Sequence, residues 1–293
     1  MSSVKYSIKD LENFTQIKAH TIRIWEQRYG LLTPKRTDTN IRYYSEDDLK
    51  KILNINLLYT SGYKISKIAL LSEAEIIEEA KSFILVTETS KQSEIDALTL
   101  LILDFKGTDI KKSLETQLKS IALEDIYTDL VLPLLRKLGQ LWQVNSINIV
   151  HEHYFSNIFR EFLVCNIEAL KTSPNPSKSA ILFLHDYEEH EFSILLYYYL
   201  LKKNGYDCHY FGQKVPIKEI YSAFMQIKPN LVVSTFTAKI SEKNFKKIES
   251  VLLDMSKKSK VIISGSQLTN SNIKLSSDIF HVKTIDELNQ LLG

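Results

Sequence analysis

The stretch TIRIWEQRYGLL, residues 21–32, places two arginines, a tryptophan, a tyrosine and a glycine within twelve positions. We expect a helix that begins near Ile17 and ends at Gly30, because glycine is favoured just past a helix end. Helical spacing puts three of its bulky side chains on one face, namely Ile22, Trp25 and Tyr29. Arg23 lies off that face, so the helix combines a side that packs on its own domain with a basic side that faces outward.

Short helices and a hairpin are predicted around this helix. Ser45 with Asp48 has the spacing of a capping box, which starts a helix. Before it, residues 31–45 (LLTPKRTDTNIRYYS) are rich in turn formers and alternate like a small hairpin. The order helix, turn, helix, hairpin, helix predicts a winged helix-turn-helix domain over residues 1–75.

Charge is unevenly spread along the 293 residues, whose net charge is only +2. Residues 1–72 carry twelve basic and seven acidic side chains, residues 73–175 carry ten and sixteen, and residues 176–293 carry fifteen and twelve. The low net charge argues against a generic polyanion binder. A basic first segment beside an acidic middle instead directs any phosphate partner to the N-terminal domain.

In the remainder of the chain the hydrophobic pattern changes once. Residues 76–174 are almost wholly helical in pattern and predict an amphipathic helical bundle. Residues 173–179 (SPNPSKS) read as a linker. Beyond it the apolar runs AILFLH, NLVVST and VIISGS alternate with helical stretches, which predicts a Rossmann-like, flavodoxin-like parallel sheet over residues 175–293.

The spacing of the cysteines and the length of the apolar runs indicate in which cellular compartment the protein resides. Cys165 and Cys208 have no paired spacing, so neither a disulfide framework nor a cysteine-ligated metal site is expected. No apolar run approaches the roughly 20 residues needed to cross a bilayer, and the N-terminus lacks a signal-peptide pattern. We therefore expect a cytoplasmic protein with no membrane partner.

The basic side chains of the first domain are candidate DNA contacts. Lys18 and His20 lie near Arg23 on the helix, and the hairpin adds cations that reach phosphates, namely Lys35, Arg36 and Arg42. From the residues alone, a solvated basic helix followed by an ordinary loop is the alternative.

The segment TIRIWEQRYGLLTPKRTDTNIRYYSEDDL, residues 21–49, resembles the MerR family of bacterial transcription regulators. That family has an LR-x-[YW]-E helix, then GLL-x-P-x-R and a wing ending R-x-Y. The resemblance implies binding of double-stranded operator DNA, with dimers on the DNA. The residues it assigns to DNA are Lys18, His20, Thr21, Arg23, Arg28, Tyr29, Lys35, Arg36, Arg42 and Tyr43. The variant WEQRYG is similar to a subgroup whose C-terminal half binds cobalamin.

The first constellation bearing on a cofactor is Trp142 followed after nine residues by Glu152 and His153. Taken alone, an adjacent Glu-His pair on a helix is more often a surface pair than a ligand site. An aromatic side chain with two polar groups at helix ends nevertheless suits a large flat ligand with polar edges. The spacing resembles the helical cap of cobalamin-binding regulators, which implies that these three side chains cover the upper face of the corrin.

The second constellation is HDYEEHEFS, residues 185–193, at the end of the first predicted strand. Taken in isolation, the pattern Glu188-x-His190 is more often a histidine that caps a helix than a metal ligand. The resembling family motif is Asp or Glu, any residue, His, two residues, Gly, with the histidine as lower axial ligand to cobalt. The resemblance thus assigns the metal to His190 and its orientation to Glu188.

Two further motifs follow at the sequence spacing found in the family. The family continues with S-x-[LT] and then paired glycines, and here Ser234-Thr235-Phe236 and Ser264-Gly265 stand at those distances from Ser193. The resemblance assigns to the cofactor the residues Ser193, Ser234, Phe236, Ser264 and Gly265. Three of these depart from the motif: serines replace glycines at 193 and 264, and Phe236 replaces a smaller Leu or Thr. Gln143 also stands where light-sensing members often have a second histidine.

These features together predict a non-enzymatic regulator whose oligomerisation, as dimer or tetramer, and operator binding depend on adenosylcobalamin or methylcobalamin. A light response is a further hypothesis by analogy with the family. One alternative keeps DNA binding but has lost the cofactor, so that the C-terminal half serves oligomerisation or partner binding. A corrinoid-dependent enzyme subunit is the alternative of another class, and the N-terminal domain argues against it.

Overall fold

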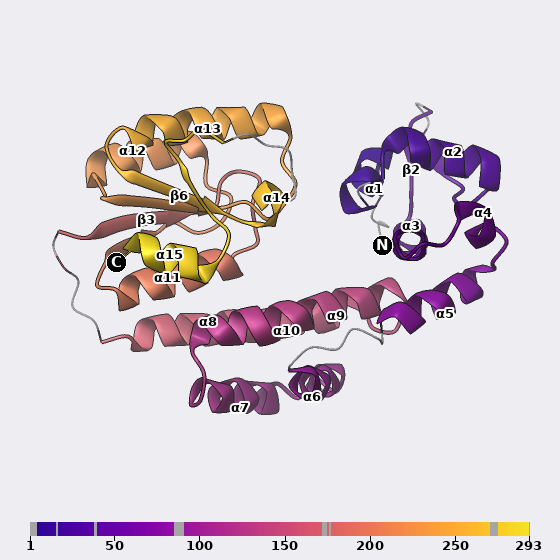
Figure 1. Cartoon of the computed structure of the whole chain (residues 1–293), viewed down its shortest axis with the longest axis horizontal. Helices are drawn as coiled ribbons and strands as arrows, with labels where there is room; N and C mark the ends of the chain where they lie inside the picture. The colour runs from indigo at the N-terminus through magenta and orange to yellow at the C-terminus, as the bar shows by residue number, and fades with distance from the viewer. Residues whose placement is uncertain are drawn as a thin grey trace. The chain divides into compact units, whose positions relative to one another are not determined.

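The computed structural model describes residues 5–15, 17–37, 40–84, 91–171, 175, 177–269 and 275–292. The chain forms two compact units, Met1–Ser156 and Asn157–Gly293, which divide within one long helix (Figure 1). The predicted linker lies partly outside the described residues. Within those residues no helix is long and apolar enough to cross a membrane, and both cysteines are free.

The first unit opens with a small domain, here called the head (residues 5–71). Its elements are α1 (Ile8–Thr15), α2 (Ala19–Tyr29), β1 (Lys35–Arg36), β2 (Arg42–Tyr43), α3 (Glu46–Thr60) and α4 (Ile65–Ile68). The two short strands pair antiparallel, with Lys35 opposite Tyr43. This is the predicted order of helix, turn, helix, hairpin and helix, and the hairpin is the wing.

Local signals in the sequence fix the ends of the head's helices. Gly30 ends α2 in the left-handed conformation, with φ of 62°, which glycine adopts without strain. Ser45 accepts the backbone N–H of Asp48 while the Asp48 carboxylate accepts the N–H of Ser45, so the predicted capping box starts α3. Around these ends the head buries its large side chains in two apolar clusters.

Helices make up the rest of the first unit and continue into the second. They are α5 (Glu73–Ile84), α6 (Gln92–Leu103), α7 (Gly107–Leu118), α8 (Leu123–Asp125), the π-helical turn η1 (Ile126–Val131), α9 (Leu132–Gln143) and α10 (Ile149–Ala169). Buried side chains recur along α9 at helical spacing, namely Leu134 and Leu138. The helical bundle expected for the middle of the chain is therefore confirmed.

The second unit contains a five-stranded parallel sheet in the order β4-β3-β5-β6-β7 (Figure 1). Its strands and helices are β3 (Ser179–Phe183), α11 (Phe192–Lys203), β4 (Asp207–Tyr210), α12 (Ile217–Ile227), β5 (Leu231–Thr235), α13 (Glu242–Ser256), β6 (Lys260–Ser264), α14 (Ser266–Thr269), β7 (Phe280–Val282) and α15 (Ile285–Leu292). Helices α12 and α13 cover one face, and α11 and α15 cover the other. The Rossmann-like prediction is confirmed.

The strand order fixes where a ligand site can form. From β3 the chain crosses to β4 on one side and then returns past β3 to β5 on the other. A reversal of this kind leaves a crevice at the carboxyl ends of the two strands, where such sheets bind their ligands. The segments that leave this edge are residues 184–191 after β3 and residues 236–241 after β5, and both carry predicted site residues.

Candidate functional sites

Helix α2 has one buried and one exposed face. Ile22 and Trp25 are buried in the two clusters of the head, and the half-buried Tyr29 packs beside Trp25. Trp25 also meets Tyr59 of α3 edge to face, with ring centroids 5.3 Å apart. The exposed face carries side chains at i, i+3, i+4 and i+7, namely His20, Arg23, Ile24 and Gln27. Arg23 thus projects from a helix that is firmly held from behind.

The side chain of Glu26 ties α2 to the wing. Its carboxylate accepts a hydrogen bond from the hydroxyl of the fully buried Tyr44 and lies 3.6 Å from Nε of Arg42. Burial, followed by the hydrogen bond to Glu26, raises the pKa of Tyr44, so this hydroxyl stays protonated as a donor. Glu26 was not among the predicted DNA-binding residues, although it stands in the motif. Its part is to fix the wing relative to α2.

The other predicted DNA-binding side chains lie on the surface of the head. Lys18 pairs with Glu12 at 3.4 Å, and Arg36 donates to the Asn40 side chain at 2.7 Å. Two of the predicted aromatic residues make cation–π contacts: Arg28 lies over the ring of Tyr29, and Lys5 lies over the ring of Tyr43. Lys35 is exposed and Thr21 is half-buried at the start of α2. Helix and wing thus carry donors and cations on their exposed sides.

A carboxylate–histidine pair occupies the edge of the sheet beyond β3. Nδ1 of His190 lies 2.6 Å from Oε1 of Glu188. The Glu188 side chain is fully buried, whereas 62% of the His190 side chain is exposed. Because Nδ1 donates to the carboxylate, the lone pair of the imidazole is on Nε2. This is the arrangement in which a carboxylate orients a histidine for a metal ion.

Backbone donors from both strand ends hold the Glu188 carboxylate. Oε1 also accepts the N–H of Glu189 at 3.0 Å and of His190 at 2.9 Å. Oε2 accepts the N–H of Thr237 at 2.5 Å and of Ala238 at 2.7 Å. Burial alone would raise the pKa of Glu188, but these hydrogen bonds outweigh it and lower the pKa to about 2. The carboxylate is therefore charged and joins the segment after β3 to the segment after β5.

Three fully buried polar atoms at the same edge have no hydrogen-bond partner among the described residues: Nε2 of His185, Oγ of Ser234 and Oγ1 of Thr235. His185 uses Nδ1 to accept the N–H of Tyr187 at 3.2 Å, which leaves its proton on Nε2. Burial lowers the pKa of His185 to about 4, so the ring is neutral. Buried donors without acceptors are costly, and a ligand can satisfy them.

The motif residues at the ends of β5 and β6 pack tightly. Phe236 is fully buried, with its ring 4.4 Å from that of His185. Gly265 has φ of 120°, and a Cβ there would lie 2.2 Å from the carbonyl oxygen of Phe236. Only glycine fits, because the backbone of this chain fills the space. Ser264 accepts a hydrogen bond from the buried hydroxyl of Tyr197 at 2.8 Å, a contact that the sequence did not indicate. Ser193 lies in the first turn of α11.

Trp142, at the end of α9, packs against the head. It adjoins the apolar cluster that contains Leu49 and Ile52 of α3, and the Lys50 ammonium lies over its ring at 5.0 Å. The next residue, Gln143, donates through Nε2 to Oδ1 of the buried Asn54 at 2.9 Å.

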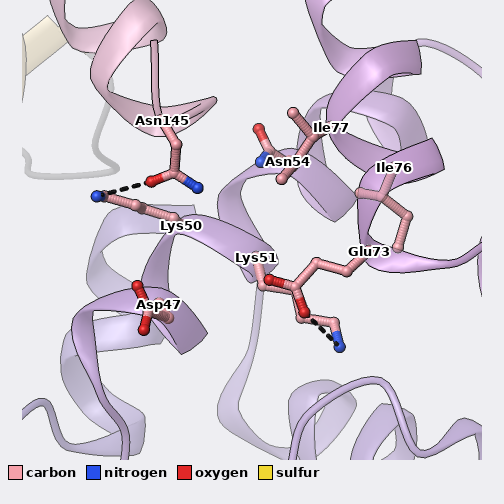
Figure 2. A pocket seen from close by; sticks show the side chains of 8 residues that line it. All are labelled: Asp47, Lys50, Lys51, Asn54, Glu73, Ile76, Ile77 and Asn145. Atoms are coloured by element: carbon pink, nitrogen blue, oxygen red, sulfur yellow. Dashed lines mark hydrogen bonds and ion pairs between the residues drawn. The ribbon is translucent and has the colours of Figure 1, made fainter. Parts of the chain in front are cut away.

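Figure 2 shows the small pocket beside this contact, where Nζ of Lys50 donates to Oδ1 of Asn145 at 2.9 Å. The pocket is lined from α3, from the start of α5 and from the turn after α9. The end of α9 is thus held by side chains of the head.

Glu152 and His153 lie in the first turns of α10. Nδ1 of His153 is 2.8 Å from Oε2 of Glu152, and Oε1 of Glu152 accepts the hydroxyl of Ser156 at 2.5 Å. His153 exposes 68% of its side chain. The described residues hold no cluster of three or more metal-ligating side chains.

Two family models match the chain. Residues 6–75 match that of MerR HTH family regulatory proteins, and residues 94–164 match that of the B12 binding domain.

Curated relatives cover most of the chain. The chain is 25% identical over 257 residues to the HTH-type transcriptional repressor CarH of Myxococcus xanthus, covering 84% of this chain and 83% of the relative. It is also 25% identical over 231 residues to the repressor CarA of the same organism, covering 78% and 75%. The chain is thus homologous to two repressors over both units.

The fold is also found among solved structures. The monomethylamine corrinoid protein of Methanosarcina barkeri superimposes with a TM-score of 0.52 and 15% identity, over 69% of this chain and 98% of that protein.

Proposed function

We propose that this chain, in which a MerR-type DNA-binding region precedes a B12-binding region as the family models indicate, is a transcription regulator that responds to a bound cobalamin. The main support for cobalamin binding is the buried Glu188 carboxylate, which holds Nδ1 of His190 at the carboxyl edge of the sheet. We assign residues 1–75 to DNA binding, 76–174 to the cap over the cofactor and 175–293 to the cobalamin domain.

The residues at the sheet edge fit a corrinoid. A corrinoid would bring most of the ligands of its own cobalt, and Nε2 of His190, which has a lone pair, would hold that cobalt from the protein side. Glu188 keeps the imidazole oriented and its proton on Nδ1. The unpartnered hydroxyls of Ser234 and Thr235 offer hydrogen bonds to the polar nucleotide end of a cobalamin. When bound, the group supplies a cobalt ion whose upper ligand can be exchanged.

We assign the upper side of the corrin to the cap. The motif formed by Trp142, Glu152 and His153 supports this assignment, because an aromatic surface with two polar groups suits the ring and its amide edges. Ser193, Phe236, Ser264 and Gly265 belong to the proposed site as residues that shape the channel for the nucleotide end.

We assign DNA reading to α2 and phosphate contact to the wing. A helix held from behind by Ile22 and Trp25 presents Arg23 and its neighbours to the major groove. Lys35 and Arg36 of the wing contribute salt-dependent affinity. Cobalamin would shift the population between arrangements of the protomers in a dimer or tetramer, and so the number of heads presented to one operator. A response to light would reverse that shift if the bound form is adenosylcobalamin.

A second candidate is a regulator whose C-terminal half no longer binds cobalamin. The full burial of Phe236 favours it, since this side chain stands where the motif has a smaller one. The second unit would then serve oligomerisation or partner binding. We do not assign an enzymatic activity, because a DNA-binding region belongs to a regulator and the two homologous relatives are repressors.

The proposed function is tested by DNA binding with and without the cofactor. An operator is selected from random duplexes with the full chain, and its affinity is measured by fluorescence anisotropy in the dark, with and without adenosylcobalamin, and again after illumination. We expect binding that weakens steeply with salt, is lost in Arg23→Ala and changes at least several-fold with the cofactor. Salt-sensitive DNA binding whose affinity is unchanged by cobalamin would favour the cofactor-free regulator. Absence of specific DNA binding would overturn the proposal.

A further inference from the structure

The exposed face of α2 contains one large apolar side chain. Ile24 exposes 47% of its surface, between Arg23 on one side and Gln27 one turn further along. Its neighbours along the chain, Ile22 and Trp25, point the other way and supply the core. Neither of the two described clusters of the head includes Ile24. Among the described residues, the two clusters of the head therefore do not account for an isoleucine at this position.

The surroundings of Ile24 indicate what it faces. The flanking exposed positions on α2 are polar or basic, and the first 72 residues have an excess of five positive charges. This charge directs the exposed face of α2 toward phosphate-bearing duplex DNA. In the major groove the base edges present donors, acceptors and one apolar group, the C5 methyl of thymine. An aliphatic side chain held at the groove by a rigid helix complements that methyl group and no other feature of the base edges.

We propose that Ile24 contacts the C5 methyl of a thymine in the operator and so selects thymine at one position of each half-site. The inference rests on the proposed DNA-binding function and adds a specificity-determining residue to it. Arg23 and the wing would supply affinity and orientation, while Ile24 supplies discrimination that is independent of charge. The contribution of Ile24 should accordingly be insensitive to salt, unlike that of the cations.

The test removes the two halves of the contact separately. In the selected operator each thymine is replaced in turn by deoxyuridine, which lacks only the C5 methyl. We expect one such replacement per half-site to weaken binding of the unaltered protein about four-fold, as expected for one buried methyl group. Ile24→Ala should lose a similar factor on the thymine operator and nothing further on the deoxyuridine operator. Ile24→Val, which keeps a branched side chain, should retain most of the discrimination.

Leu70→Ala is the matched control, because Leu70 is an aliphatic residue of the same head with 85% of its surface exposed. It should leave affinity and thymine preference unchanged, and circular dichroism should show all three variants folded. Equal loss of affinity for Ile24→Ala on thymine and deoxyuridine operators would overturn the inference while leaving DNA binding intact. Failure of the unaltered protein to bind any selected duplex would instead overturn the proposed function on which the inference rests.

Discussion

The Glu188 side chain joins the segments that leave the carboxyl edge of the sheet. Its carboxylate accepts four backbone N–H groups in addition to Nδ1 of His190, and it is fully buried. Hydrogen bonds to a buried charge are among the strong ones in proteins, and removing the charge leaves several donors unsatisfied. The same group therefore stabilises the fold and orients the imidazole of His190.

Glu188→Gln is expected to lower the free energy of unfolding by about 3 kcal/mol, because the amide keeps one acceptor oxygen and turns an NH2 group toward backbone donors. Glu189→Gln is the matched control, since Glu189 makes a surface ion pair with Lys214 and such pairs contribute little. Urea denaturation of both variants measures the difference. Equal stability of the two variants would contradict the role given to Glu188.

His185 predicts a pH dependence of stability. Burial lowers its pKa from 6.5 to about 4 in the folded protein, so below pH 6.5 the unfolded chain binds a proton that the folded protein does not. Stability is then lost as the pH falls from 6.5 toward 4, by up to about 3 kcal/mol. The lowered pKa of Glu188 acts in a separate window, from pH 4.5 down to about 2.

His185→Phe should remove most of the loss of stability between pH 6.5 and 4 and leave the loss at lower pH in place; a smaller loss remains in the first window because burial also lowers the pKa of His281. Thermal denaturation across pH 3 to 8 gives both curves. If the variant and the unaltered protein lose stability in parallel through that range, the account of His185 as a buried neutral histidine is wrong.

At the scale of elements, the tie between α2 and the wing depends on Glu26. Tyr44→Phe removes the hydroxyl that donates to Glu26 but keeps the buried ring, so it should cost about 1 kcal/mol of stability. Glu26→Ala should cost more, because it also removes the partner of Arg42. We expect both variants to weaken operator binding through a loosened wing, as measured by anisotropy. Undiminished affinity in a destabilised Glu26→Ala protein would show that the tie serves stability alone.

Most elements could be predicted from the sequence because their signals are local. The Ser45–Asp48 capping box, the glycine after α2 and the apolar strands all lie within a few residues of the structure they produce. The short β7, residues 280–282, lacks such a run and was missed. The partners of the site residues could not all be predicted, since two of the four N–H groups that hold Glu188 come from a segment about fifty residues further along the chain.

For the whole molecule, the family models agree with a MerR-type region that precedes a B12-binding region, over residues 6–75 and 94–164. The division of the chain into three functional parts stays a prediction. The contact of Trp142 and Gln143 with α3 was not predicted, because it joins residues about ninety positions apart. It means that a residue assigned to the cofactor cap also contacts the DNA-binding head. A substitution at Trp142 is therefore expected to affect the head as well as the cofactor.

The most direct test of the account is whether the chain retains a corrinoid through His190. The purified protein is incubated with adenosylcobalamin in the dark, passed through gel filtration and examined by absorption spectroscopy, beside His190→Ala and the control His209→Ala. We predict corrin absorbance that co-elutes with the unaltered protein and the control, and a lost or altered spectrum in His190→Ala. Colourless elution from saturating cobalamin, or identical spectra for all three proteins, would contradict the account.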